Sequence, residues 1–179
     1  AVIGEQIKRE PRGVLGINRF CVYDYPQVIT NRPLIVLEPD IEIFPTLYWL
    51  TCPYLNKEVA QLEADGFIAQ FEQRIDEDPE FAAAVRKNHA DYAARRLALI
   101  PVEVRERMGK DYPQRYQVLA ETGVGGTRNP HGVKCLHAHV ADYLVNGENV
   151  IGAETVKLLD GKLDCEQASC RSFAVDEGI

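Results

Sequence analysis

The chain lacks any apolar run that approaches the length of about 20 residues that a membrane-spanning helix needs. Its richest apolar stretch, residues 44–55, is short and is interrupted by Pro45 and Pro53. The first six residues, AVIGEQ, also lack the basic and apolar regions of a signal peptide. We therefore expect a cytoplasmic protein without a membrane segment.

Positive charge is in deficit, because the formal net charge at pH 7 is −7. This balance argues against a broad surface for nucleic acid or for an anionic membrane. Basic residues do gather between residues 86 and 107, but Glu103 and Glu106 lie among them, which favours a solvated helix face. The composition leaves a protein partner or a homo-oligomer open.

Internal repeats and low-complexity tracts are missing, and 179 residues suffice for one well-filled domain. In a reducing compartment, the five cysteines indicate free thiols or metal ligands rather than a disulfide framework. We predict one domain over residues 1–179. It is mainly β over residues 1–52 and mainly α over residues 53–160, and a polar tail with two cysteines follows over residues 161–179.

The first fifty residues are rich in β-branched and aromatic side chains with turn residues between them. This pattern predicts three or four short strands of an antiparallel sheet, with Pro26 and Asn31-Arg32-Pro33 as punctuation. The strand candidates are residues 14–17, 20–23, 34–37 and 46–50.

From Pro53 onward the apolar residues recur at helical spacing. Asp78-Pro79-Glu80 is typical of a helix start and predicts a long helix that ends before Pro101. Further helices are expected over residues 55–62, 68–75, 133–144 and 150–159. Residues 102–117 predict a helix and then a turn at Tyr112-Pro113, and residues 121–130 predict a loop. The predicted fold class is α+β, with a small N-terminal antiparallel sheet packed against a predominantly helical C-terminal part.

The string Lys134-Cys135-Leu136-His137-Ala138-His139 holds a thiol and two imidazoles within five residues. Cysteine and histidine are ligands that zinc and iron prefer. On an ideal helix, Cys135 and His139 share a face, whereas a Cys135 in the preceding loop can turn toward His137. The spacing therefore marks Cys135 as a ligand and leaves the choice between His137 and His139 open.

Other candidate groups each have a plain structural alternative. Cys21 and Cys52 lie at predicted strand ends, where ligands can converge, although a free cysteine is commonly a small buried hydrophobe. Cys165 and Cys170 can be metal ligands, a redox pair or incidental thiols. The glycine-rich residues 123–126 with Arg128 can bind an anion, but a flexible connection is favoured, and His89 on an apolar helix face is favoured as structural.

At these residues the chain resembles a family of small bacterial proteins catalogued as domain of unknown function 501. The resemblance covers most of residues 12–160. Its segments are residues 12–21, residues 44–53, the Asp78-Pro79 helix with His89 and Tyr92, and residues 133–147. The resemblance implies Cys21, Cys52, Cys135 and His137 as a four-ligand set, with His139 peripheral or substituting. It implies no activity.

Four hypotheses about function follow. The first is a structural zinc site closed by the four-ligand set, in which the free energy of metal binding becomes folding free energy. The second is a metal-dependent hydrolase-type enzyme with three protein ligands and an open position, with Arg128 or His89 near the substrate. The third is an iron–sulfur redox centre on Cys21, Cys52, Cys135 and a tail cysteine. The fourth is a metal-free interaction module.

Overall fold

The structure is a computed structural model that describes residues 2–37 and 40–173. Its strands are β1 (Val14–Phe20), β2 (Pro26–Asn31), β3 (Leu34–Leu37), β4 (Asp40–Ile43) and β5 (Tyr48–Leu50). Its helices are α1 (Val2–Ile7), α2 (Pro53–Ala64), α3 (Phe67–Glu77), α4 (Pro79–Ala98), α5 (Val102–Asp111), α6 (Pro113–Glu121), α7 (Leu136–Asn146) and α8 (Val150–Leu158). Two short 3₁₀ helices, η1 (Val124–Gly126) and η2 (Ser169–Phe173), complete the described part.

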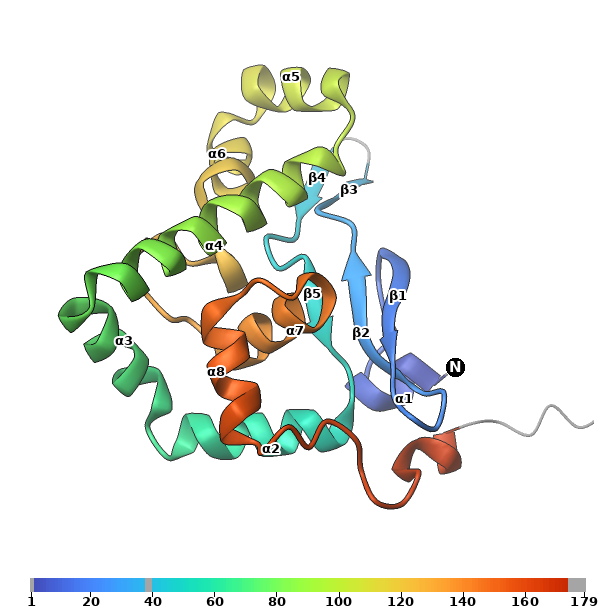
Figure 1. The fold of residues 1–179 in the computed structure, drawn as a ribbon. Helices are drawn as coiled ribbons and strands as arrows, with labels where there is room; N and C mark the ends of the chain where they lie inside the picture. Colours follow the sequence, from blue (N-terminus) through green and yellow to red (C-terminus); the bar gives the residue numbers. More distant parts are fainter. Residues whose placement is uncertain (1, 38–39, 174–179) are drawn as a thin grey trace, which may run out of the picture.

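The predicted α+β class is confirmed, with antiparallel strands followed by helices (Figure 1). The strands form a three-stranded sheet in the order β1-β2-β5 and a separate hairpin of β3 and β4. Ile29 at the centre of β2 pairs with Ile17 on one side and with Trp49 on the other. The predicted break at Asn31-Arg32-Pro33 does separate two strands, β2 and β3, but Pro26 begins β2 instead of preceding it as punctuation, and residues 26–31 form the buried central strand of the sheet.

Local chemistry explains where the helices begin and end. Asp78 caps α4, since its Oδ1 atom accepts hydrogen bonds from the N–H groups of Glu80 and Phe81, both at 3.0 Å. Gly147 ends α7 with φ of +75°, a conformation that favours glycine. The helix expected before the Tyr112-Pro113 turn is α5, and a second helix, α6, which the sequence does not predict, begins at Pro113.

Helix α7 lies in the middle of the helical part, surrounded by β5, α2, α4 and α8 (Figure 1). Its apolar side chains, among them Leu136, Val140 and Ala141, are buried in the main hydrophobic cluster. Burial of each large apolar side chain contributes about 1.5–3 kcal/mol, so this packing fixes α7 in place. The N-terminal end of α7 is thereby held against α2 and β5.

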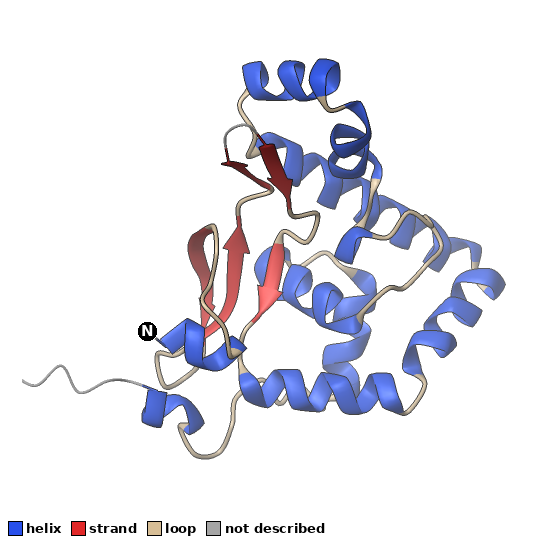
Figure 2. Ribbon diagram, turned by 180° about the vertical axis from the view of Figure 1, so that it is seen from behind, coloured by secondary structure: helices blue, strands red, loops and turns tan. Residues whose placement is uncertain are grey.

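The N-terminal helix α1 and the C-terminal helix η2 lie close together beside the three-stranded sheet (Figure 2). Neither helix is predicted by the apolar spacing of the sequence, and their placement brings the two ends of the described chain to one side of the molecule.

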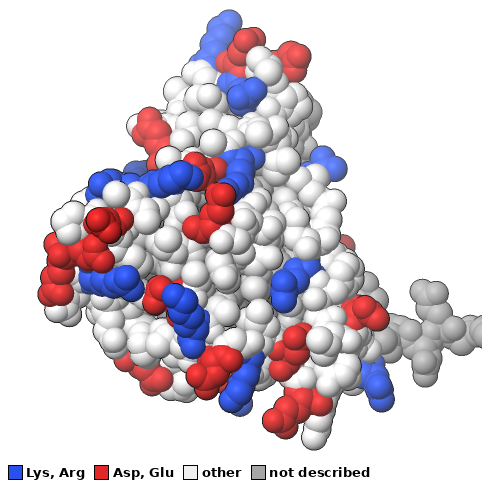
Figure 3. All heavy atoms as spheres, in the orientation of Figure 1, with Lys and Arg blue, Asp and Glu red and all other residues white. Residues whose placement is uncertain are grey.

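No helix in the described part is long and apolar enough to cross a membrane. On the face shown in Figure 3, acidic and basic side chains are interspersed.

Candidate metal centre

Cys135 is the N-cap residue of α7, and its extended backbone places the thiol just outside the first helical turn. The first N–H groups of a helix have no partner within the helix. Here the N–H group of Leu136 donates to Oε1 of Glu63, in the last turn of α2, over 2.6 Å. One carboxylate from α2 therefore holds the N-terminus of α7, where the helix dipole also favours negative charge.

Three side chains meet at this helix end. A ligand atom from each of Glu63, Cys135 and His137 lies within 4.8 Å of the other two. Within residues 2–37 and 40–173, this is the one group of three or more Cys, His, Asp or Glu side chains with such spacing. Each of the three side chains is half-buried, so the group sits at the boundary between the interior and solvent.

His137 is held at both ring nitrogens. Its Nδ1 atom lies 3.1 Å from Oε1 of Glu63, and its Nε2 atom lies 3.1 Å from the carbonyl oxygen of Asn56. Burial lowers the pKa of His137, but this is outweighed by hydrogen bonds with Cys135 and the Asn56 carbonyl and by the charge of Glu63, which raise it to about 9. In the metal-free protein at neutral pH, His137 is therefore an imidazolium that donates from both nitrogens.

The group opens into a pocket of about 490 Å³. Cys135 and His137 form part of its wall, and Lys8 and Arg9, which follow α1, bring positive charge to it. The guanidinium of Arg9 lies 4.4 Å from the ring centre of Trp49, in a cation–π contact. The remaining lining residues are Gln6, Ile7, Thr46, Tyr48, Leu50, Asn56 and Ala138. The pocket thus combines a thiol, an imidazole, two cations and aromatic surface.

The structure brings together two of the four ligands that the family resemblance implies. Cys135 and His137 meet, while Cys21 and Cys52 lie outside the group within 4.8 Å. Cys52 is buried as the N-cap residue of α2, and Cys21 is half-buried beyond the end of β1. Glu63 is the third member of the group, and the sequence does not indicate it because it lies more than seventy residues before Cys135.

His139 is on a different side of α7 from this group and is buried in the core. Its Nδ1 atom lies 3.0 Å from Oδ1 of Asn149, and its Nε2 atom has no partner among the described residues. Burial lowers its pKa to about 3, so the imidazole is neutral. Of the two histidines that the spacing leaves open, His137 is the one beside Cys135.

The glycine-rich segment serves a packing role. The Nδ1 atom of His89 accepts a hydrogen bond of 3.1 Å from the N–H group of Val124. A Cβ atom at Gly123 would lie 2.3 Å from this nitrogen, so only glycine allows the close approach. A second pocket of about 490 Å³ lies here, with Arg128 and His89 in its wall. Neither residue belongs to the Cys/His/Glu group.

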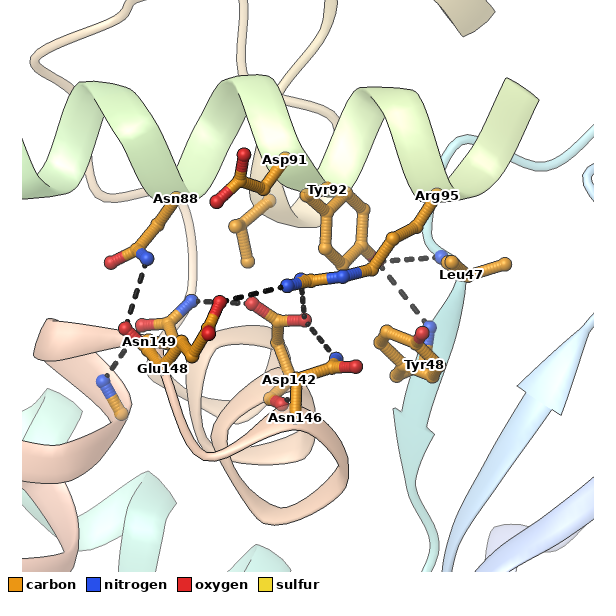
Figure 4. Close-up of polar contacts among 12 residues, drawn as sticks. Leu47, Tyr48, Asn88, Asp91, Tyr92, Arg95, Asp142, Asn146, Glu148 and Asn149 are labelled. Atoms are coloured by element: carbon orange, nitrogen blue, oxygen red, sulfur yellow. Dashed lines mark hydrogen bonds and ion pairs between the residues drawn. The ribbon is translucent and has the colours of Figure 1, made fainter. Parts of the chain in front are cut away.

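A polar network behind α7 holds the helix against α4 (Figure 4). Asp142 of α7 accepts from Arg95 of α4 and from Asn149, at 3.4 and 2.8 Å. The hydroxyl of Tyr92 accepts from the N–H groups of Leu47 and Tyr48, at 2.6 and 3.3 Å, and so ties α4 to the start of β5. These bonds fix the elements that carry Cys135, His137 and the pocket wall.

The fold and the site define an α+β protein with a Cys/His/Glu group at a helix N-terminus beside a pocket. The family described as Protein of unknown function (DUF501) matches residues 17–157, and the chain belongs to this family. The match includes Glu63, Cys135 and His137 and ends before Cys165 and Cys170. No curated protein and no solved structure matches the chain.

Proposed function

We propose that Glu63, Cys135 and His137 bind a zinc ion and that the protein is a zinc-dependent hydrolase. The observation that carries this proposal is the meeting of three ligand atoms within 4.8 Å beside the pocket. Thiolate, imidazole and carboxylate are all zinc ligands, and catalytic zinc sites use three protein ligands with a fourth position left for water or substrate. Structural sites, by contrast, are closed by four protein ligands.

The second nitrogen of His137 supports this assignment. Metal-bound histidines commonly donate their other N–H group to a carbonyl or a carboxylate, which fixes the ring orientation. The Asn56 carbonyl already holds Nε2 in this way, so Nδ1 is the nitrogen that faces Cys135 and Glu63. Zinc would replace the proton that Nδ1 carries in the metal-free protein.

The chemistry of the pocket favours an anionic substrate. Its wall contains the cations of Lys8 and Arg9, and no Asp or Glu of the described part of the chain lines it. Zinc lowers the pKa of bound water to about 7, which supplies hydroxide at neutral pH. Hydrolysis of an ester in this pocket would join the hydroxide to the electrophilic carbon or phosphorus and break the bond to the leaving group, which would take up the proton that the water had released.

Zinc binding tests the site directly. Metal-free protein is titrated with zinc against a chromophoric chelator, and the same titration is made on Cys135→Ser, His137→Gln and Glu63→Gln. We expect the wild type to bind at least one zinc per chain and each variant to lose one site. His139→Asn is the matched control, because it alters a neighbouring histidine outside the group. Equal zinc binding by the wild type and all three variants would overturn the proposal.

Activity is tested on a panel of carboxylate-bearing esters, phosphate esters and one neutral ester. We expect zinc-dependent hydrolysis that falls at least about 100-fold in Cys135→Ser, because loss of a metal ligand disorders the site. Lys8→Ala should raise KM for the anionic members and leave a neutral ester unaffected. Zinc binding without hydrolysis of any member would contradict the enzymatic part of the proposal.

A further inference from the structure

The four cysteines outside the proposed zinc site come from three separate parts of the chain. Cys21 follows β1, Cys52 precedes α2, and Cys165 and Cys170 belong to the segment after α8. All four are free cysteines. Helix η2, which contains Cys170, lies against α1 at the side of the three-stranded sheet (Figures 1 and 2). The topology therefore gathers these cysteines at one end of the molecule.

Hydrogen bonds fasten the segment that contains Cys165 to the start of β2 and to the turn after Cys21. The residues on either side of Cys165, Asp164 and Glu166, both take part, so Cys165 is held beside the β1–β2 connection. The three bonds run from Gln27 Nε2 to the Leu163 carbonyl (2.6 Å), from the Val22 N–H group to Asp164 Oδ1 (3.0 Å) and from the Tyr23 hydroxyl to the Glu166 carbonyl (2.9 Å).

Gln6 of α1 links Cys170 to the same place. Its Nε2 atom donates to the sulfur of Cys170 at 3.3 Å and to the carbonyl oxygen of Pro26 at 2.8 Å. The hydroxyl of Thr51, the residue before Cys52, donates to that same Pro26 carbonyl at 3.3 Å. Gln6, Thr51, Cys52 and Cys170 are all buried, and Oε1 of Gln6 has no partner among the described residues.

The thiols are near enough for their charges to interact. Burial, with a smaller contribution from the charges of Cys170 and Cys165, raises the pKa of Cys52 to about 11. Burial also raises the pKa of Cys170, and Cys165 and Cys21 act on it in the same direction. The hydrogen bonds of Gln6, Thr51 and Asp164 thus bring the four cysteines to one part of the molecule, where a bound metal would compensate the charge of deprotonated sulfurs.

We infer that Cys21, Cys52, Cys165 and Cys170 together bind a metal centre that is separate from the proposed zinc site. The chemistry is a four-thiolate set, which holds either a zinc ion or an iron–sulfur cluster. No three of these sulfurs lie within 4.8 Å in the described part of the chain. Tetrahedral zinc, with Zn–S bonds of about 2.3 Å, would draw the sulfurs to about 3.8 Å apart. An iron–sulfur cluster spans a wider gap, because its thiolates bind different irons.

Metal content is the first test. Wild-type protein is purified anaerobically, and zinc, iron and acid-labile sulfide are measured together with visible absorbance. We expect either about one zinc per chain above that of the Cys52→Ser and Cys170→Ser variants, or iron and sulfide with visible absorbance that both variants lose. Cys135→Ser is the control, because it removes the proposed zinc site and leaves the four-thiolate set intact. Unchanged metal content in Cys52→Ser and Cys170→Ser would overturn the inference.

Thiol alkylation tests the inference without any substitution. Native wild-type protein is treated with iodoacetamide before and after chelation, and the modified cysteines are identified by mass spectrometry. Cys21 and Cys165 are only partly buried, so metal ligation would be their main protection. We expect both to be modified at least about fivefold faster after chelation. Equal rates with and without the chelator would contradict the four-thiolate site, whatever the state of Cys135.

Discussion

Arg95 of α4 and Asp142 of α7 form an ion pair in which one partner is buried and the other is not. Their closest atoms, Nη1 and Oδ1, are 3.4 Å apart, as the dashed contact in Figure 4 indicates. The exposed fractions of the Arg95 and Asp142 side chains are 29% and 1%. Burial raises the pKa of Asp142, while hydrogen bonds from Asn149 and Asn146 and the charge of Arg95 oppose that rise. Arg95 thus compensates a carboxylate that would otherwise be costly to bury.

Replacement of Arg95 by leucine should therefore destabilise the protein in a pH-dependent way. We expect the free energy of unfolding at pH 7 to fall by about 1–3 kcal/mol, below the range for a fully buried pair because Arg95 is partly exposed. When the pKa of an Asp is higher in the folded protein than in the unfolded protein, this group favours the folded state at pH values below its unfolded pKa. That contribution is lost as the pH rises through its folded pKa. Because Arg95→Leu raises that pKa further, its cost should shrink between pH 7 and pH 5.

Urea unfolding followed by circular dichroism at both pH values measures this effect. The matched control is Asp142→Asn, which removes the charge but retains one oxygen for the amide donors. In that background, Arg95→Leu should cost less at pH 7 and should show little pH dependence. The same loss in both backgrounds would show that Arg95 stabilises the protein through packing and its ion pair with Glu148 rather than through Asp142.

Arg96, near the C-terminal end of α4, connects this helix to the end of α6 and to the loop before β5. Its side chain is fully buried and donates to the carbonyl oxygens of Leu119 and Pro45, each at 2.7 Å, and to that of Thr122. Burial lowers its pKa to about 10, so it is still charged at neutral pH. Lysine cannot reach three carbonyls with one ammonium group. We expect Arg96→Lys to lower the free energy of unfolding by about 2–4 kcal/mol, since each carbonyl left unpaired costs about 1–3 kcal/mol.

The melting temperature checks this prediction, with Arg105→Lys as the control because Arg105 belongs to the peripheral helix α5. Arg96→Met should be at least as harmful as Arg96→Lys, since it removes all donors. A melting temperature for Arg96→Lys within about 2 °C of the wild type would contradict the role of the fork-shaped guanidinium.

The sequence predicts those elements whose boundaries are set by local chemistry. Asp78 caps α4 and Gly147 ends α7 as expected, because capping depends on side chains within a few residues. Strand β2 is missed since its buried polar residues have distant partners. Gln27, for example, bonds to Leu163, and no local pattern reports that contact.

The same limit applies to the candidate site. The string around Cys135 and His137 is visible in the sequence because both residues belong to one turn of helix. Glu63 is not, since it reaches them only through the packing of α2 against α7. The closeness of Cys21 and Cys52 to the cysteines of the C-terminal segment likewise depends on where that segment packs against the sheet, and hydrophobic periodicity cannot predict this.

Two buried neutral imidazoles should make the fold sensitive to acid. The rings of His89 and His139 lie 5.8 Å apart, and burial lowers the pKa of both, that of His139 to about 3. An unfolded histidine takes up a proton near pH 6.5, whereas these folded ones do not. Such groups add stability above pH 6.5 that is lost as the pH falls toward their folded pKa values. The free energy of unfolding should therefore decrease steadily from pH 6.5 to pH 4.

His89→Asn tests this cause, because the asparagine oxygen can accept from Val124 as Nδ1 of His89 does. The variant should be less stable than the wild type at pH 7, since it leaves a cavity. Its unfolding free energy should nevertheless fall less steeply between pH 6.5 and pH 4. A slope as steep as that of the wild type would assign the acid sensitivity to other groups.

Glu63 supports the end of α7 apart from any role as a ligand, and two substitutions separate these roles. Glu63→Gln keeps an oxygen for the N–H group of Leu136, whereas Glu63→Ala leaves that donor unpaired. We expect Glu63→Ala to lower the unfolding free energy of metal-free protein by about 1 kcal/mol more than Glu63→Gln, as for loss of a helix cap. Chemical unfolding in the presence of a chelator measures the difference. Equal stability of the two variants would show that the carboxylate does not cap α7.

Gly152 allows α8 to pack directly on the backbone of α7. A Cβ atom at this position would lie 2.3 Å from the carbonyl oxygen of His139 and 2.5 Å from the Cβ atom of Tyr143, and neither neighbour is the flexible end of a side chain. Gly152→Ala should therefore force the helices apart and cost about 1–3 kcal/mol, despite the better helix propensity of alanine. Gly109→Ala in α5 is the matched control, because the added Cβ atom would lie at an ordinary 3.9 Å from Cδ1 of Tyr116, and this variant should gain up to about 1 kcal/mol. Thermal unfolding of the two variants should move in opposite directions, and a stabilised Gly152→Ala variant would mean that α7 and α8 can separate without loss.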